Sequence, residues 1–345
     1  MISLLTPAAA RIHIGLLIAL RVLSGLGEGF MPPASEAMIA RWTVPRFYTV
    51  VACTILGGID TGVIVGLFSA GILCDYGFAG GWPSVFYVFG MIGCVWFVCW
   101  CFLCYSSPYT HPRISRVELE YFERMIGAED LARHPPTPWK KILTSVPVWA
   151  LAAVFFAECW LFYGLMTSLP LYMHDVLGLN MTHLGVLSAI PFVGTIISAP
   201  ITCLVVDWLR APGRLSTGVV RKVSCFAGLM LCDICLVIIW FVGCNRALAV
   251  LNFFVLLVCD GIVINCVTAN QLDLAPLHAG KLMGLTNTVA ILGGILQPLV
   301  VSAMTAQQST RSTWQGVFFV TAVVNTFGAL VFVIFGSGNR QSWAD

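Results

Sequence analysis

Nine long apolar segments dominate the sequence and leave it few possible folds. A helix needs about 20 mainly apolar residues to cross a hydrocarbon layer roughly 30 Å thick. Nine segments meet this length: 12–38, 48–74, 84–104, 146–170, 184–207, 222–243, 247–272, 282–304 and 315–336. Hydrophobic residues make up 59% of the 345 residues and charged residues only 10%, and the alternating pattern of a membrane barrel is absent. We therefore predict an all-α, multi-pass protein of the lipid bilayer.

Positive charges collect in alternate loops, and this asymmetry predicts an orientation. Only Arg11, Arg246 and Arg311 fall in the loops of one side, whereas the other loop lysines and arginines fall on the opposite side. By the positive-inside rule the basic side is cytoplasmic. The sequon at Asn180 lies on the non-cytoplasmic side, which makes Asn180 a glycosylation candidate. The net charge of +2 indicates no nucleic-acid partner.

The sequence offers little support for a metal, a cofactor or an enzyme. The fourteen cysteines are scattered through the apolar segments. Cys101/Cys104 and Cys232/Cys235 have C-x-x-C spacing, but neither has the second pair or the histidine of a zinc site beside it, so we interpret the cysteines as packing residues. No H-E-x-x-H, G-x-S-x-G or Walker A motif is present. We expect no cofactor, no metal and no enzymatic activity.

One long polar segment divides the chain into unequal parts. Three predicted spans precede residues 105–145 and six follow them, so we expect a partial N-terminal half at 1–104, a cytoplasmic loop at 105–145 and a six-helix half at 146–345. Ser115 and Glu118 predict a capped amphipathic helix in the loop. Transporters built from repeated halves have equal numbers of spans, so the arithmetic suggests that three helices are missing before this sequence.

Several motifs resemble those of a known family. They are "RVLSGLGEG", "GGWPSVFYVFG", "QLDLAPLHAGKLMGLTNT" and "FGALVFVIFGSG". In this order they resemble the anion:cation symporters of the major facilitator superfamily, the group of sialin, the vesicular glutamate transporters and the sodium-phosphate cotransporters. The resemblance runs along essentially the whole chain. It implies that the nine spans are helices 4–12 of a twelve-helix fold in a lysosomal, vesicular or plasma membrane.

Arg21 and Glu28 stand out as two opposite charges deep in the first span. They are seven residues apart, so they project from the same face of one helix. A charge at that depth costs at least about 2.5–3.5 kcal/mol, so it should face a cavity or a partner. We interpret Arg21 as a group for an anionic substrate and Glu28 as a proton-coupling group, and the resemblance implies the same roles. The alternative is an ion pair that locks helices together. Pro32 and Pro33 predict a kink in the same span.

Five further acids fall within or at the ends of the spans, and each is a functional candidate by default. Asp60 and Glu158 are possible pocket residues. The Asp-Thr-Gly sequence at Asp60 matches the aspartic-protease tripeptide, but that chemistry needs two such aspartates, so we treat it as coincidence. Asp273 lies near a helix end, where a clamp between helices is favoured over a substrate role. The sequence assigns no role to Asp233 or Asp260.

The chain departs from the family that it resembles at pocket positions. Glu158 stands where vesicular glutamate transporters have an arginine and sialin has a tyrosine, and Glu36 and Gln271 each replace a histidine. These exchanges make the pocket more negative and disfavour a substrate with two carboxylates. Tyr163 and Asn287 could add a hydroxyl and an amide to the pocket, or could form hydrogen bonds between helices.

The segment "VVDWLRAPGR" is similar to a cytoplasmic loop signature of the superfamily. Its Asp207, Arg210 and Arg214 could form a charge latch that stabilises one of two conformations; the alternative is a solvated basic loop. The sequence as a whole favours a secondary active transporter that moves a small organic or inorganic anion by alternating access, coupled to H⁺ or Na⁺. A truncated or non-transporting fragment or isoform of such a carrier is the alternative.

Overall fold

The computed structural model describes residues 2–44, 47–126, 136–178, 187–210, 215–243 and 245–344, and every regular element in these ranges is a helix. Within them, nine helical segments are long and apolar enough to cross a membrane, which confirms the predicted spans. Their helices are α2 (Ile14–Glu28) with α3 (Met31–Trp42), α4 (Tyr48–Tyr76), α5 (Trp82–Leu103), α9 (Val146–Asp175), η3 (Ile190–Phe192) with α11 (Val193–Leu209), α12 (Thr217–Val242), α13 (Arg246–Leu274), η4 (Pro276–His278) with α14 (Ala279–Thr305), and α15 (Arg311–Phe335).

The first span is broken near its middle, as its prolines predict. α2 ends at Glu28 and α3 begins at Met31, with Pro32 in the first turn of α3. Proline fits the first turn because it has no N–H to leave unpaired there, but it cannot continue the preceding helix. The helix is therefore interrupted at its two prolines, directly after the Arg21–Glu28 segment.

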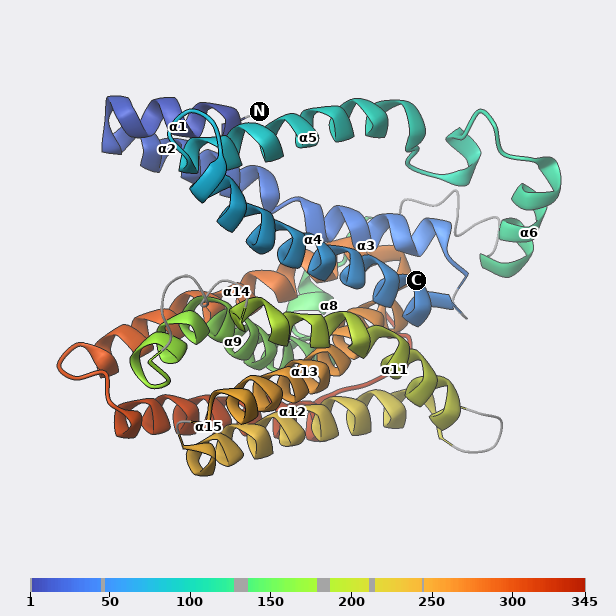
Figure 1. Ribbon diagram of the computed structural model, residues 1–345. Coiled ribbons are helices and arrows are strands. Elements are labelled where there is room, and N and C mark those ends of the chain that lie inside the picture. The colour runs from blue at the N-terminus through green and yellow to red at the C-terminus, as the bar shows by residue number, and fades with distance from the viewer. Residues whose placement is uncertain are drawn as a thin grey trace.

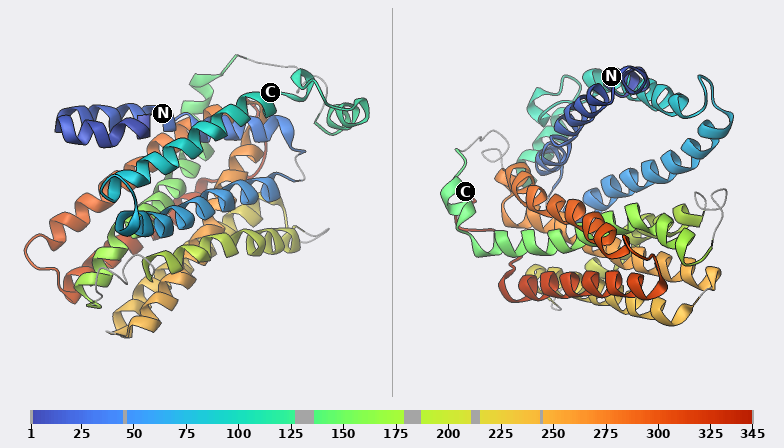
Figure 2. Two further views of the ribbon diagram at one scale, coloured as in Figure 1. Left: turned by 45° about the horizontal axis from the view of Figure 1, so that its top comes forward. Right: turned by 90° about the vertical axis from the view of Figure 1, so that its left-hand side faces the viewer.

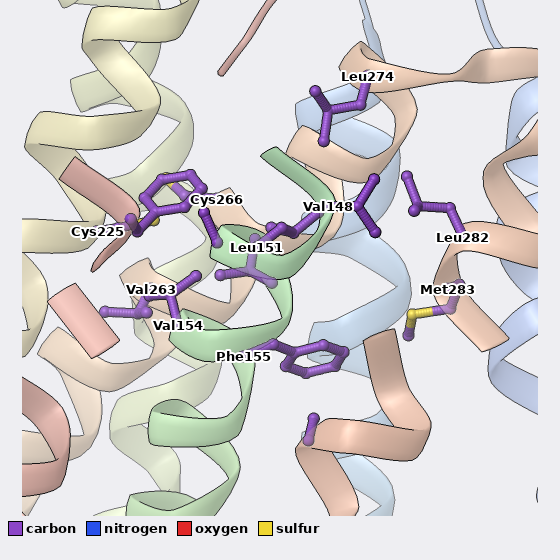
Figure 3. Packing of buried hydrophobic residues seen from close by; sticks show 14 of the residues in the cluster. Val148, Leu151, Val154, Phe155, Cys225, Val263, Cys266, Leu274, Leu282 and Met283 are labelled. Carbon is purple, nitrogen blue, oxygen red and sulfur yellow. The ribbon is translucent and has the colours of Figure 1, made fainter. Parts of the chain in front are cut away.

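Helix α9 forms the centre of the second half. It contacts α13, α14 and α15, and its side chains Val148, Leu151 and Phe155 lie in the main buried cluster shown in Figure 3. Glycine allows close contact between α9 and α14, because a Cβ added at Gly293 of α14 would lie only 2.6 Å from the carbonyl oxygen of Phe156. The second half is thus a packed helical bundle in which α9 contacts α13, α14 and α15, and α13 contacts α11 and α12.

The two halves meet through α3 and α4. α3 packs on α14, and α4 packs on α11 and α13. Ile39, Tyr48, Leu272 and Ala279 form a small buried cluster at this contact. In Figures 1 and 2 the short helix α1 (Ile2–Ile12), α2 and α5 form a layer on the side of α3 and α4 away from α12 and α15. The contact between the halves therefore concentrates at the end of the bundle predicted to be cytoplasmic.

The segment between the halves contains η2 (Pro108–Thr110), α6 (Arg116–Ile126) and α8 (Trp139–Leu143). The predicted helix is confirmed, because the backbone N–H of Glu118 donates to Ser115 Oγ at 3.1 Å. Phe122 of α6 contacts Trp42 edge to face, with ring centroids 6.1 Å apart. This contact holds α6 against the end of α3.

Candidate functional site

Arg21 lies at a groove within the first half. The groove has a volume of about 610 Å³ and is lined by side chains of α1, α2 and α5. The Arg21 guanidinium sits over the Phe86 ring, 5.0 Å from its centroid, in a cation–π arrangement. A guanidinium held in this way keeps its N–H donors free to bind a carboxylate or a phosphate. The groove can therefore receive an anionic group.

Glu28 projects from the same helix, one turn beyond Ser24. The Ser24 hydroxyl donates to Glu28 Oε1 at 3.2 Å, and both Arg21 and Glu28 are exposed. Neither residue is among the described ion pairs. Their structure therefore does not favour the alternative of an ion pair between helices.

A second group of charged side chains lies where the halves meet. Asp60 of α4, Glu158 of α9 and Asp260 of α13 lie close enough for their charges to interact, Glu158 with Asp60 and Asp260 with both. Asp260 is fully buried, Glu158 is 3% exposed and Asp60 is half-buried. In the described part of the chain, both oxygens of Asp260 and Oε2 of Glu158 have no hydrogen-bond partner. We call these three residues the acid cluster.

The neighbours of the acid cluster do not neutralise it. The Cys159 thiol lies beside Glu158, and the Thr195 hydroxyl lies beside Asp60 but donates to the carbonyl oxygen of Phe192 at 2.7 Å. The charges that act on Asp260 are those of the other two carboxyls. An arrangement of this kind can accept a positive charge, because like charges close together in a dry site favour neutralisation.

Two other acids are fully provided with donors. Asp233 of α12 accepts from Asn325 Nδ2 at 2.9 Å and from Thr326 Oγ1 at 3.0 Å, both on α15. Asp273 of α13 accepts from Arg221 Nε at 2.9 Å. The predicted interhelix clamp at Asp273 is thus confirmed, and Asp233 makes a second one between α12 and α15.

The remaining pocket candidates lie along α9, α13 and α14. Tyr163 is half-buried and faces Gly294, where an added Cβ would lie 2.8 Å from its ring; the charge of Glu158 acts on it. Gln271 is fully buried and donates to Thr286 Oγ1 at 3.2 Å, which ties α13 to α14. Asn287 is half-buried on α14. The structure brings Tyr163 near the acid cluster.

Some predictions fall outside the described residues. They include the glycosylation candidate Asn180, Arg214 of the charge latch and the side chain of Asp207. Arg210 is half-exposed at the end of α11. Among the described residues, no group of three or more His, Cys, Asp or Glu side chains has the arrangement of a metal site.

Sequence reasoning missed the association of Asp260 with Asp60 and Glu158. One signal was available, since each of the three acids falls near the midpoint of its helix and hence at a similar depth. Equal depth alone does not show which helices are neighbours. The packing of α4 on α13 supplies that information.

Comparison with known proteins places these features in a family. A profile of the Major Facilitator Superfamily matches residues 1–298. Vesicular glutamate transporter 3 of Danio rerio is 37% identical over the whole chain, which spans 58% of that relative. Human sialin is 36% identical over 99% of the chain, and the match covers 68% of sialin. Human vesicular glutamate transporter 2 is 38% identical over the whole chain, and the match covers 59% of that transporter.

The helices and these matches define a multi-pass membrane protein. The chain belongs to the major facilitator superfamily and, within it, to the anion:cation symporter group. The resemblance noted from its motifs is confirmed.

Proposed function

We propose that the chain acts as a secondary active transporter that moves a small organic or inorganic anion by alternating access, coupled to H⁺ or Na⁺. The observation that carries this proposal is the position of ionisable groups. Arg21 lines a groove among apolar helices, and the acid cluster lies where the two halves meet. Intramembrane charges are costly, and they mark substrate and ion pathways.

In this proposal Arg21 binds the anion and Glu28 takes part in proton coupling. The guanidinium stands over an aromatic ring with its donors available, and Glu28 follows on the same helix, directly before the break at Pro32. A helix that is interrupted beside a charged group can move that group when one half rocks against the other. The two residues would then respond together to opening and closing.

We propose further that the substrate carries one negative charge. Two of the relatives are vesicular glutamate transporters, and glutamate has two carboxylates. Here Glu158 is buried near Asp60 and Asp260, and a second carboxylate on the substrate would meet their negative potential whenever these acids are ionised. A monoanion avoids that repulsion.

Transport by the purified chain in liposomes tests the proposal. The probes are a radiolabelled sugar monocarboxylate, glutamate and inorganic phosphate, each with an inward H⁺ gradient or Na⁺ gradient. We expect saturable, gradient-driven uptake of a monoanion, lost in Arg21→Ala and retained in the control Arg116→Gln, which changes an exposed arginine of α6. Glu28→Gln should retain exchange of the anion but lose the response to the gradient.

The alternative is a non-transporting fragment or isoform of such a carrier. The chain spans only 58% of one relative's length, and α2 has no buried residues. Folded protein that takes up none of the probes with either gradient would favour this alternative. Three further apolar segments encoded in frame upstream of Met1 would support the fragment.

A further inference from the structure

We propose that Asp60, Glu158 and Asp260 form a proton-binding site between the two halves of the chain, separate from Arg21 and Glu28. Nothing in the comparisons assigns a role to this acid cluster. The site itself is inferred from geometry, whereas its part in coupling rests on the carrier function proposed above.

The acid cluster is assembled from three helices and from both halves. Asp60 comes from α4 in the first half, and Glu158 and Asp260 come from α9 and α13 in the second. α13 packs on both α4 and α9, which brings the midpoints of the three helices together. Because Asp60 lies on the other half, the cluster is complete only while the halves are in contact at this level.

The orphaned oxygen atoms point to a ligand. Asp260 is 0% exposed, and neither of its oxygens has a hydrogen-bond partner among the described residues; the same holds for Oε2 of Glu158, which is 3% exposed. An ionised carboxylate without a partner is extremely costly in such surroundings. Each of these carboxyls is therefore either protonated or bound to a cation.

The surroundings favour a proton over a larger cation. A metal ion held by carboxylate, imidazole or thiol side chains needs several of them around one point, and no group of three His, Cys, Asp or Glu side chains in the described ranges has that arrangement. A proton needs only one carboxylate oxygen, and it can be shared by two neighbouring acids. Asp260 and Glu158 interact electrostatically, and each has a carboxyl oxygen without a hydrogen-bond partner among the described residues that can hold a proton.

The other titratable groups around the acid cluster add no positive charge. Those with which its members interact electrostatically are Cys159 and Tyr163 of α9 and Cys232 and Cys259 of α12 and α13. Asp233 of α12 acts on Cys232, but its own charge is held by donors of α15. From α11, the neighbour is the hydroxyl of Thr195. A bound proton is thus the available means of neutralisation.

This location links proton binding to the movement of the halves. When the halves are in contact, the three acids are brought together and protonation is favoured. When the halves separate at this level, Asp60 moves away and water reaches Glu158 and Asp260, so that an oxygen–hydrogen bond breaks and the proton passes to water. Proton release therefore accompanies the conformational change.

Infrared difference spectroscopy on the full chain in lipid nanodiscs tests the site without a transport substrate. We expect wild-type protein at neutral pH to show C=O stretching bands of protonated carboxyls that shift in D₂O and vanish at alkaline pH. Asp260→Asn and Glu158→Gln should each remove bands, and Asp60→Asn should move the loss of the remaining bands to lower pH, because the negative charge that opposes ionisation of the other two acids is gone. The matched control Asp233→Asn removes an acid that already has two donors, and it should leave those bands in place.

Thermal unfolding provides a second readout. Because the folded state binds the proton and the unfolded state releases it at neutral pH, stability should fall as the pH rises. Asp260→Asn should flatten this dependence, since the amide resembles a protonated acid in shape and charge. If that variant fails to fold, Glu158→Gln and the wild-type spectra still test the site.

Two results would overturn the proposal. One is a set of carboxyl bands that none of the three cluster variants changes. The other is loss of the bands on adding sodium at constant pH and ionic strength, which would show a sodium site. Absence of transport with the bands intact would reject only the carrier function, and transport without the bands would reject only the site.

Discussion

Breaking the pair between Arg221 and Asp273 should be among the most damaging single changes in the second half. Arg221 is 1% exposed, and its Nε lies 2.9 Å from Asp273 Oδ2. Asp273→Asn keeps the shape of the side chain but leaves the guanidinium buried without its countercharge. Removing one member of a buried pair costs about 3–5 kcal/mol, because the other charge stays in a poorly solvating site.

The free energy of unfolding in detergent, measured by denaturant titration, tests this magnitude. We expect Asp273→Asn to lose about 3–5 kcal/mol and the double variant Arg221→Met/Asp273→Leu to recover most of the loss, because apolar side chains of similar volume can replace a buried pair. Lys222→Gln is the matched control. It removes one positive charge from the next, half-exposed position and should change stability by no more than about 0.5 kcal/mol. A loss below about 1 kcal/mol in Asp273→Asn would refute the reasoning.

Two further changes probe the packing of the bundle. Gly293→Ala should cost about 1–3 kcal/mol of unfolding free energy, since its Cβ would lie 2.6 Å from the carbonyl oxygen of Phe156. Gly57→Ala should be neutral, because a Cβ added there meets no atom within 4 Å. Equal losses in the two variants would contradict this prediction. The thiols of Cys53 on α4 and Cys203 on α11 are in hydrogen-bonding contact, so mild oxidation should cross-link the two halves. After cleavage at a protease site inserted between α6 and α8, the fragments should stay joined on a non-reducing gel, and separation in the oxidised sample would rule out the contact.

The positions of the helices followed from the sequence because length and apolar content decide what can cross a bilayer. Their ends were harder to predict. We expected one span to begin at residue 222, the second of two adjacent basic residues, but α12 begins at Thr217, with Ser216 as its N-cap. The sequence does not show that Arg221 is buried, because its partner Asp273 lies on another helix.

The candidate site was likewise predictable from the sequence only in part. The clamp at Asp273 could be predicted from its place near a helix end, and Arg21 and Glu28 from their depth in an apolar segment. The sequence could not show which acids lie close to one another, because their proximity depends on the packing of α4 against α13. A single sequence contains no record of that packing.

The lack of hydrogen-bond donors at Asp260 does not reflect a shortage of polar residues in the spans. Asp233 meets an amide and a hydroxyl from α15, Asn325 and Thr326, on a helix that is otherwise largely apolar. Asp260 lies near the midpoint of its own helix, and among the described residues neither of its oxygens has a hydrogen-bond partner. A chain that can place two donors at one buried carboxyl could place them at another, and fixed donors at Asp260 would stabilise its charged form permanently. Leaving those oxygens unpaired instead makes the charge of Asp260 depend on a proton that can leave when the halves move apart.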